Sequence, residues 1–298
     1  MSTYRDLLRW GRMELNRAHI PDGDLDAWYL MEYVFEMDRA HYFLRESEEA
    51  GSQEEEYRRL ISLRCGRIPL QHLTHQAWFM GLEFYVDGRV LVPRQDTEIL
   101  VEEAVRRLED GQRLLDMCTG SGCILLSILS QKPCCNGTGV DLSADALEVA
   151  RLNGRRLNIT ADFRQSDLFT DIGGRYEMIV SNPPYIPTGV IPTLEEDVRS
   201  YDPNLALDGG EDGLSFYRRI VEQASTRLED GGWLLFEIGH DQGRCVRDMM
   251  ENAGYGELQV VKDLAGRDRV VLGRRSRRRW HQCRSVPVPV QILRSLLR

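Results

Sequence analysis

The chain has 298 residues, of which 42% are hydrophobic and 29% are charged, a balance typical of a globular protein with one large or two ordinary domains. Its formal net charge of −9 disfavours a nucleic-acid backbone as direct partner, because such binding depends on cationic side chains. No apolar run approaches the roughly 20 residues of a membrane helix, and the opening MSTYRDLLRWGRMELN lacks the apolar core of a signal peptide. We therefore expect a cytoplasmic protein with no membrane contact and no direct DNA contact.

The seven cysteines favour neither a metal centre nor disulfides. They contain no CxxC pair and no Cys/His cluster with the spacing of a zinc site. The adjacent Cys134 and Cys135 are able to bind a metal, but two thiols in a loop are the favoured interpretation. We expect reduced thiols and no metal.

Residues 1–76 have a helical pattern. In DLDAWYLMEYVFEMD, residues 24–38, apolar side chains recur three and four residues apart, and QEEEYRRLISLR, residues 53–64, continues this spacing. No glycine-rich loop or metal-ligand spacing accompanies them. We predict a small all-α bundle over residues 1–76 that recognises a partner or positions another domain.

The pattern changes over residues 77–94, where WFMGLEFYVDGRVLV alternates between apolar and polar side chains. This segment contains the pair Asp87-Gly88, which is a strong signal for a hairpin turn. We predict a β-hairpin linker over residues 77–94 with its turn at Asp87 and Gly88.

Helices and strands alternate over residues 95–273. DTEILVEEAVRRLED is typical of an amphipathic helix capped by Asp96 or Thr97, and SADALEVARLNGRRL of a helix capped by Ser143. Further helices are expected at CILLSILSQ and at about 214–229 and about 241–253. Such repetition predicts a doubly wound, mostly parallel sheet, in which the last two strands, joined by DLAGRD, form an antiparallel edge. The expected strands are RLLDM, GTGVDL, DFRQSD, YEMIV, WLLFEIG, ELQVVKD and RVVLG.

The final residues 274–298 fit none of these patterns. They contain eight arginines, no acidic residue and a Val-Pro repeat, without an apolar face long enough to pack. We expect a disordered basic tail, and a contact with RNA or an acidic surface is the alternative.

The segment LLDMCTGSGC, residues 114–123, predicts a strand, a loop of small residues and the start of a helix. Gly120 and Gly122 allow the backbone to approach a ligand closely, and the helix start offers free N–H groups. Asp141 ends the next strand, 19 residues after Gly122, where an acid can accept hydrogen bonds from two ribose hydroxyls. Together these features indicate an adenosine-containing cofactor.

The choice between NAD and S-adenosylmethionine depends on details of this loop. TGSGCI lacks the third glycine of the NAD fingerprint, and Asp116 would repel a pyrophosphate but can meet the ammonium of a methionine moiety. Further on, Asp167 is placed to accept from an adenine amino group while Leu168 covers the ring. These details favour S-adenosylmethionine.

SNPPY, residues 181–185, follows the apolar strand YEMIV and makes a stiff exit from the sheet. The Asn182 side-chain oxygen and the Pro183 carbonyl can each accept one hydrogen of a substrate NH2 group. Two fixed acceptors would hold this nitrogen near a sulfonium methyl group and offset the positive charge that develops during transfer. Tyr185 can stack on a flat amide or base. The motif therefore predicts methylation of a carboxamide or an aromatic amine.

Over residues 60–273 the chain resembles the protein-(glutamine-N5) methyltransferases that modify peptide chain release factors. Asn-Pro-Pro-Tyr is shared with adenine-N6 DNA methyltransferases, whereas the long YDPNLALDGGEDGL and the PRQDTE segment are far more specific. The matching segments are PLQHLTH, LVPRQDTEILVE, LLDMCTGSGC, GVDLS, QSDLF, IVSNPPYIP, YDPNLALDGGEDGLSFYRRI, FEIGHDQG and DLAGRDRVVLGR.

The resemblance implies a class I S-adenosylmethionine-dependent methyltransferase domain, Rossmann-like, behind a helical N-terminal domain. The implied substrate is the glutamine of the GGQ motif in a release factor, and we expect a monomer. By this match, Asn182, Pro183, Pro184 and Tyr185 hold the glutamine, and Arg94 and Glu98 shape the site without reacting. The cofactor contacts implied by the match are Cys118, Thr119, Gly120, Ser121, Gly122, Asp141, Leu168 and Asn182, to which the loop analysis adds Asp167.

Three positions depart from the family pattern. Gln95 replaces the second proline of PRPDTE, His75 stands where the family has a small residue, and Leu168 stands where relatives often have an aromatic residue. We expect His75 to pack or to lie on the surface. The alternatives to release-factor methylation are a ribosomal-protein glutamine, adenine in DNA, and a protein that binds cofactor or partner without turnover.

Overall fold

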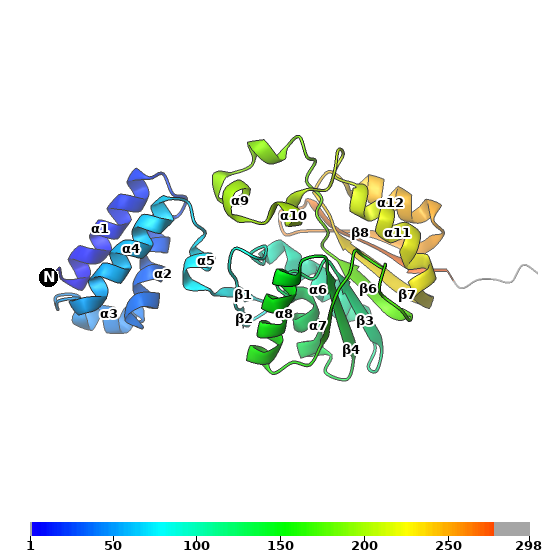
Figure 1. Cartoon of the computed structure of the whole chain (residues 1–298), viewed down its shortest axis with the longest axis horizontal. Helices are drawn as coiled ribbons and strands as arrows, with labels where there is room; N and C mark the ends of the chain where they lie inside the picture. Colours follow the sequence, from blue (N-terminus) through cyan, green and yellow to red (C-terminus); the bar gives the residue numbers. More distant parts are fainter. Residues whose placement is uncertain (1, 277–298) are drawn as a thin grey trace, which may run out of the picture.

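The computed structural model describes residues 2–276. It contains a helical bundle, a two-stranded hairpin and an α/β domain in chain order (Figure 1). The tail is predicted to be disordered, and its residues from 277 on lie outside the described range. The boundary expected at residue 274 falls inside a strand, because the last strand continues through Arg275.

The N-terminal bundle confirms the helical interpretation. Its helices are α1 (Tyr4–Arg17), α2 (Gly23–Phe35), α3 (Arg39–Arg45), α4 (Glu54–Cys65) and the short α5 (Leu70–Thr74). The apolar residues spaced three and four apart converge on one core, in which Leu7, Leu15, Leu30, Leu60 and Ile61 are buried. The bundle therefore has its own apolar core, while the exact domain limits stay predictions.

The hairpin exists, but the predicted turn is wrong. Strands β1 (Ala77–Phe79) and β2 (Leu82–Phe84) pair antiparallel around Met80 and Gly81, whose φ angles are 51° and 76°. Two consecutive left-handed residues make the tight turn whose twist suits a hairpin. Asp87 and Gly88 come after β2, where the Asp87 carboxylate accepts hydrogen bonds from the backbone and guanidinium of Arg89.

A seven-stranded sheet forms the α/β domain, and its order is β5-β4-β3-β6-β7-β9-β8. The strands from β5 to β7 are parallel, and β9 is antiparallel to both β7 and β8, so the predicted antiparallel edge is confirmed. The order reverses between β3 and β6, which is where ligands bind in such sheets. The bounds are β3 (Arg113–Met117), β4 (Asn136–Asp141), β5 (Asp162–Gln165), β6 (Tyr176–Ser181), β7 (Leu228–Glu237), β8 (Tyr255–Lys262) and β9 (Asp268–Arg275).

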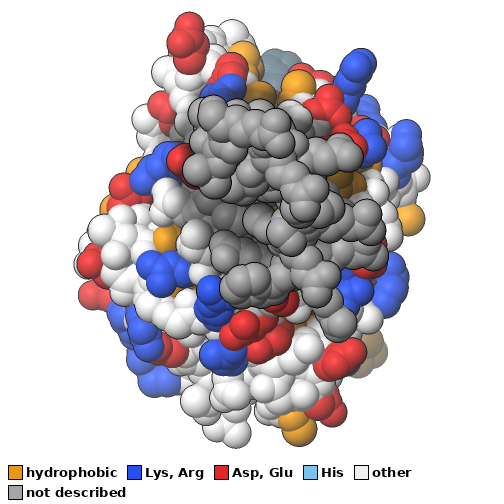
Figure 2. Space-filling model, turned by 90° about the vertical axis from the view of Figure 1, so that its right-hand side faces the viewer, with side chains coloured by type: hydrophobic (Ala, Val, Ile, Leu, Met, Phe, Trp, Pro, Cys, Tyr) orange, Lys and Arg blue, Asp and Glu red, His pale blue; other side chains and the backbone are white. Residues whose placement is uncertain are grey.

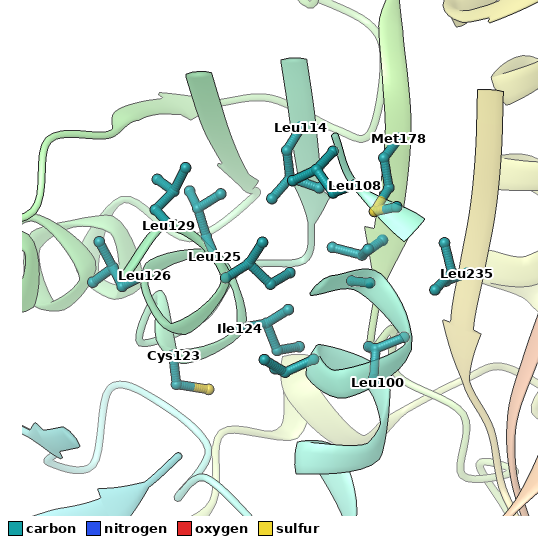
Figure 3. Close-up of a cluster of buried hydrophobic side chains, with 14 of the residues drawn as sticks. Leu100, Leu108, Leu114, Cys123, Ile124, Leu125, Leu126, Leu129, Met178 and Leu235 are labelled. Carbon is teal, nitrogen blue, oxygen red and sulfur yellow. The ribbon is translucent and has the colours of Figure 1, made fainter. Parts of the chain in front are cut away.

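Helices cover both faces of the sheet, and the strands are apolar on both faces. Helices α6 (Glu98–Arg107), α7 (Cys123–Gln131) and α8 (Ala144–Leu157) pack on the face that contains Leu114 of β3 (Figure 3). Helices α11 (Ser215–Arg227) and α12 (Gly243–Asn252) pack on the face that contains Leu115. Successive strand residues point to opposite faces, so both neighbours are buried.

Two predicted helix caps had different outcomes. The Ser143 hydroxyl oxygen accepts a hydrogen bond from the Ala146 N–H at 3.1 Å, which confirms the cap of α8. The side-chain cap predicted for α6 is wrong. A 3-10 turn over Gln95–Thr97 leads into that helix, and Thr97 makes no side-chain capping bond because its side chain bonds to Glu237 instead.

The segment after β6 connects the two domains. It contains the 3-10 turn Ile191–Thr193 and the helices α9 (Glu196–Tyr201) and α10 (Asn204–Leu207). Arg64 of α4 donates to the Asp197 carboxylate at 2.8 Å, and the Tyr201 hydroxyl donates to the Gly66 carbonyl at 2.6 Å. Helix α9 is thereby fixed to the N-terminal bundle.

Within residues 2–276, none of the helices combines the length and apolar character needed to cross a membrane. On the face drawn in Figure 2, acidic and basic side chains are mixed rather than gathered by sign.

Candidate active site

A large cleft lies at the carboxyl ends of β3, β4 and β6, where the strand order reverses. It encloses about 1030 Å³ of empty space, part of which is open to solvent. The residues on its wall that were predicted as cofactor contacts come from four separate segments. They are Cys118, Thr119, Gly120, Ser121, Asp141, Asp167, Leu168 and Asn182.

Gly122 of the predicted cofactor loop and Asp116, which precedes the loop, do not line this cleft. The predicted contact of Asp116 with the ammonium of a methionine moiety is wrong, because Asp116 is fully buried. Gly122 has a φ of 79°, and a Cβ there would lie 3.2 Å from the Cβ of Ala150, so its role is to let α7 start tightly against α8. Asp116 is fully buried beneath the loop, where its Oδ2 accepts a hydrogen bond from the Thr119 hydroxyl at 2.6 Å. Burial raises the pKa of the Asp116 carboxyl to about 7. Asp116 therefore holds the loop from below.

Asp141 lies on the cleft wall at the end of β4. Its Oδ2 accepts from the Gly120 N–H and its Oδ1 from the Ser143 N–H, each at 2.9 Å. These bonds fix the carboxylate between the cofactor loop and the start of α8. Each carboxylate oxygen keeps acceptor capacity, as two ribose hydroxyls would require. Burial raises the pKa of this carboxyl.

Asp167 and Leu168 form another part of the wall, after β5. Both carboxylate oxygens of Asp167 accept from Nη2 of Arg219 at 2.8 Å, so this acid is already engaged by a cation. Leu168 is buried, with a φ of 52°, and supplies the apolar surface expected against an adenine. Sequence reasoning missed Arg219, which approaches from α11.

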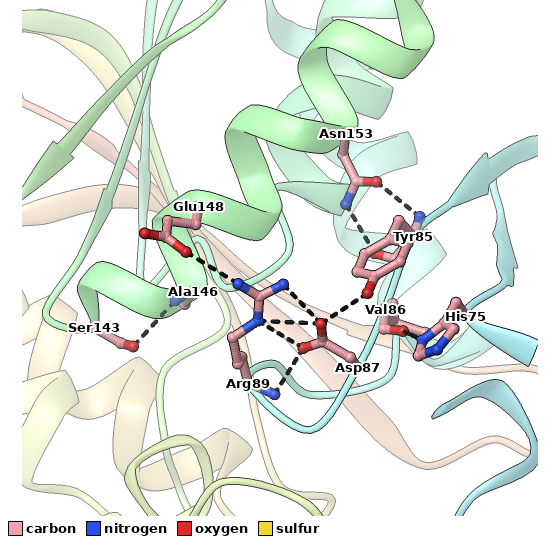
Figure 4. A network of polar contacts seen from close by, with 9 residues as sticks. All are labelled: His75, Tyr85, Val86, Asp87, Arg89, Ser143, Ala146, Glu148 and Asn153. Atoms are coloured by element: carbon pink, nitrogen blue, oxygen red, sulfur yellow. Dashed lines mark hydrogen bonds and ion pairs between the residues drawn. The ribbon is translucent and has the colours of Figure 1, made fainter. Parts of the chain in front are cut away.

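A polar network fixes the linker against the cofactor loop (Figure 4). The fully buried Asn153 of α8 accepts from the Tyr85 N–H at 2.7 Å and donates to the carbonyls of Tyr85 and Ser121 at 3.0 and 2.9 Å. In the linker, Asp87 pairs with Arg89, and Arg89 also pairs with Glu148 of α8. The linker residues Arg89, Val90 and Leu91 are thereby held as one wall of the cleft.

His75 belongs to the support of this network. Its ring stacks on that of Tyr85 with centroids 5.2 Å apart and planes 12° apart, and its Nδ1 lies 3.2 Å from the Val86 carbonyl oxygen. His75 is absent from the walls of both described cavities around the Asn-Pro-Pro-Tyr segment. Its packing role agrees with the expectation.

A second, smaller cavity of about 410 Å³ adjoins the cleft. Asn182 lines both cavities, as do Leu91, Arg94 and Ala206, so these residues lie at the junction of the two cavities. Of the other predicted substrate residues, Tyr185 lines the smaller cavity, Pro184 lines the cleft, and Pro183 is buried outside both walls. The remaining lining residues of the smaller cavity are Leu91, Arg94, Ile186, Ala206, Leu207 and Glu237.

The Asn-Pro-Pro-Tyr segment is fixed at both ends. The Ser181 hydroxyl donates to the Met117 carbonyl at 2.6 Å, which joins the ends of β6 and β3. The Tyr185 carbonyl accepts from Nε2 of Gln242 at 3.0 Å. Gly209 packs so closely that a Cβ would lie 2.7 Å from the Tyr185 Cα, and one at Gly213 would lie 2.3 Å from the Tyr185 carbonyl oxygen. These contacts explain Gly209 and Gly213 of LDGGEDG.

The two residues of the PRQDTE segment differ in position. Arg94 lines both cavities and pairs with Asp202 at 3.8 Å. Burial raises the pKa of the Asp202 carboxyl to about 6. Glu98 faces away from both cavities, and its carboxylate accepts from the Met80 N–H at 2.7 Å, which secures the hairpin turn.

Sequence reasoning missed Glu237 and the residues that close the cleft beside α10. Glu237 ends β7 in FEIG, where apolar residues on both sides make the segment look like an ordinary buried strand. The residues that close the cleft follow Asn182 in the chain and lie in or near YDPNLALDGG, a segment that the sequence indicates only as a family match. They are Pro203, Leu205, Ala206 and Phe216.

Comparison with solved structures shows the fold. A methyltransferase from Pyrococcus furiosus aligns with a TM-score of 0.54 at 19% identity, covering 72% of this chain and 99% of that chain. The hMettl16 catalytic domain aligns with a TM-score of 0.54 at 13% identity, covering 72% and 81%. Residues 94–192 match the family model "Methyltransferase small domain", and residues 6–74 match "PrmC N-terminal domain". The fold and the cleft together define a class I, S-adenosylmethionine-dependent methyltransferase.

Sequence relatives define the family. Proteins named release factor glutamine methyltransferase are 38% identical in Geobacter sulfurreducens, covering 91% of this chain and 96% of the relative, and 38% identical in Deinococcus radiodurans, covering 91% and 98%. One from Clostridium acetobutylicum is 39% identical over 83% and 90%. The chain belongs to the release factor glutamine methyltransferase family, as the motifs predict.

Proposed function

We propose that this protein transfers the methyl group of S-adenosylmethionine to the side-chain nitrogen N5 of the glutamine in the GGQ motif of peptide chain release factors. The observation that carries the proposal is the position of Asn182, which lines both the large cleft and the smaller cavity. A donor in the cleft and a carboxamide in the cavity would meet at this residue. The names of the relatives support release factors as the substrate class.

The cleft fits S-adenosylmethionine in its chemistry. Asp141 is a fixed double acceptor for the ribose, and Leu168 is an apolar cover for the base. Residues 118–121 line the same cleft and offer their backbone to the ligand. When bound, the cofactor supplies an electrophilic methyl group on a sulfonium.

Asn182 and Tyr185 of the smaller cavity then act on the carboxamide together with Pro183, which lies between them in the chain and outside both cavity walls. The Asn182 side-chain oxygen accepts one hydrogen of the substrate NH2, and the Pro183 carbonyl accepts the other. Both acceptors are stiff, because prolines follow Asn182 and because Ser181 and Tyr185 are hydrogen-bonded to neighbouring elements. They orient the nitrogen and offset its developing positive charge, while Tyr185 packs against the flat amide.

The N-terminal bundle binds the protein substrate at a distance from the glutamine that is modified. It is fixed to the segment that follows Asn-Pro-Pro-Tyr through Arg64, Asp197 and Tyr201. A truncated protein without residues 1–76 should methylate a release factor more slowly than the full-length protein. An equal rate would refute the binding role of the bundle.

Mass spectrometry tests the proposal. Release factor, ribosomal proteins and DNA are incubated separately with the enzyme and isotope-labelled S-adenosylmethionine, and labelled proteins are mapped by peptide. We expect one methyl group on the GGQ glutamine of the release factor. Label on a ribosomal-protein glutamine would move the substrate assignment, and label on DNA with none on protein would refute the proposal.

A further inference from the structure

Glu237 lies beside Asn182 at the edge of the sheet. In the parallel pairing of β6 and β7, Ser181 is opposite Phe236, so the next residues along the two chains are Asn182 and Glu237. Both line the smaller cavity, together with Tyr185. Sheet pairing therefore brings a carboxyl group and the proposed amide acceptor to the same cavity.

The Glu237 carboxyl group is buried and incompletely paired. The residue is 2% exposed, and its Oε2 has no hydrogen-bond partner within residues 2–276. A buried carboxyl oxygen without a partner costs folding free energy, and a ligand in the cavity would supply the missing partner. Because the group belongs to the wall of the cavity proposed for the substrate, a substrate group can reach it.

The charges around Glu237 leave it without an ion pair in the described chain. Arg269 of β9 is engaged by Asp96 at 3.0 Å and by Asp263 at 3.1 Å, and Arg94 pairs with Asp202. A side-chain hydrogen bond with Thr97, followed by the charges of Arg269 and Arg94, favours the charged carboxylate, whereas Asp96 opposes it. The other titratable neighbours that face this group are Tyr185, Tyr217 and Cys123.

Burial outweighs the Thr97 hydrogen bond and the two arginines, and raises the pKa of Glu237 to about 7. Near neutral pH the carboxyl is therefore present in both protonation states. This is the condition under which a carboxylate takes a proton and later releases it at a useful rate.

Resting on the proposed function, we propose that Glu237 is a catalytic residue that receives the proton lost by the substrate amide nitrogen. The nitrogen uses its lone pair to form the N–C bond to the methyl carbon, while the S–C bond breaks and leaves its electron pair on sulfur. The N–H bond then breaks, its electron pair returns to nitrogen, and the proton moves to Oε2 of Glu237. The products are an N-methyl amide, the neutral thioether and a protonated Glu237, which returns the proton to solvent.

The neighbouring acceptors cannot replace Glu237 in this step. The amide oxygen of Asn182 and the carbonyl of Pro183 accept hydrogen bonds but are too weakly basic to retain a proton at neutral pH. A carboxylate with a raised pKa can do so, and Glu237 lines the cavity proposed for the substrate.

The test uses Glu237→Gln in the full-length protein, with labelled S-adenosylmethionine and a release factor. Loss of the proton acceptor should lower turnover about 100-fold or more. Wild-type turnover should rise with pH and level off above about 7, and the variant should lose this rise. Calorimetric affinity for the cofactor should change less than about threefold, since Glu237 does not line the cleft. Glu103→Gln, a buried acid of α6 paired with Arg106 and Arg107, is the matched control and should retain wild-type turnover.

A second readout does not depend on turnover. The infrared difference spectrum between wild type and Glu237→Gln should show a carboxyl band in the ligand-free protein that disappears as pH rises through about 7. A structural role would change thermal unfolding without linking the turnover profile to this band.

The proposal is overturned if Glu237→Gln keeps wild-type turnover with the same pH profile. A flat wild-type profile between about pH 6 and about pH 8.5 overturns it without any variant, so misfolding of Glu237→Gln does not remove the test. If wild type modifies a different amide substrate, the proposed function fails while the Glu237 comparison is made on that substrate.

Discussion

The Ser181 hydroxyl donates a hydrogen bond of 2.6 Å to the carbonyl oxygen of Met117, and both residues are fully buried. Met117 ends β3 directly before the cofactor loop, and Ser181 ends β6 directly before Asn182. This one bond therefore ties the segment proposed to hold the methyl donor to the segment proposed to hold the substrate.

Replacing Ser181 with Ala should test this tie. Loss of a buried hydrogen bond should lower the free energy of unfolding by about 1–3 kcal/mol, and looser alignment of the two segments should lower turnover about tenfold. Denaturant unfolding and single-turnover methyl transfer measure the two effects. Ser225→Ala is the control, because that hydroxyl makes an exposed hydrogen bond to the Glu222 carbonyl of its own helix. Equal turnover in the two variants would contradict the proposed coupling.

Asp141→Ala should weaken cofactor binding. The variant loses the acceptor proposed for the ribose and also the anchor of the Gly120 and Ser143 N–H groups. Hydrogen bonds to a charged group contribute about 1.5–3 kcal/mol each, so we expect the dissociation constant to rise about 10- to 100-fold or more. Isothermal calorimetry with S-adenosylmethionine measures it. The exposed Asp145→Ala in the first turn of α8 should bind like wild type, and unchanged binding by Asp141→Ala would refute the assignment.

Asp116 should make stability depend on pH near neutrality. Its carboxyl has a pKa of about 7 when folded, whereas an ordinary Asp ionises near pH 4. The stability contributed by the protonated form is thus fully present below about pH 4 and is lost as pH rises through about 7. Asp116→Asn cannot titrate, so its melting temperature should change less than that of wild type between about pH 6 and about pH 8. Calorimetric melting measures this, with the exposed Asp110→Asn as control; an equal change in wild type and Asp116→Asn would contradict the prediction.

Arg64 should be a major stabilising residue of the domain junction. Its guanidinium donates to Asp26 at 2.7 Å and to Asp197 at 2.8 Å, and its side chain is 7% exposed. Arg64→Met would leave the buried Asp26 without its cation and should cost about 3–5 kcal/mol of unfolding free energy. Adding Asp26→Asn to Arg64→Met should recover part of this loss in urea unfolding. Additive losses would show that the two residues do not interact.

Much of the fold could be predicted because local signals agreed with the global arrangement. Ser143 capped its helix as expected, and the alternating strands and helices gave the parallel sheet with its antiparallel edge. The hairpin turn was misplaced because Asp87-Gly88 is the stronger turn signal by residue type, whereas Met80-Gly81 forms the turn. Pairing between β1 and β2, with Glu98 holding the Met80 N–H, decided the position instead.

The site could be predicted only in part, because residues distant in the chain complete it. The strand-end positions of Asp141 and Asn182 follow from the sequence pattern, and both lie on the cleft wall. Nothing local in the sequence reveals that Asn153 clamps Ser121, or that Arg219 reaches Asp167. Glu237 could not be predicted as a site residue, because only the pairing of β6 with β7 brings this strand-end acid beside Asn182.

The most direct measurement is methyl transfer by Asn182→Ala to a release factor under single-turnover conditions, with cofactor affinity measured in parallel. Removing one well-placed acceptor costs about 3 kcal/mol at the transition state, so the rate constant should fall at least about a hundredfold. The dissociation constant of S-adenosylmethionine should change little, because Asp141 and the loop remain. A variant that transfers the methyl group at the wild-type rate would contradict the role given to Asn182 at the junction of the two cavities.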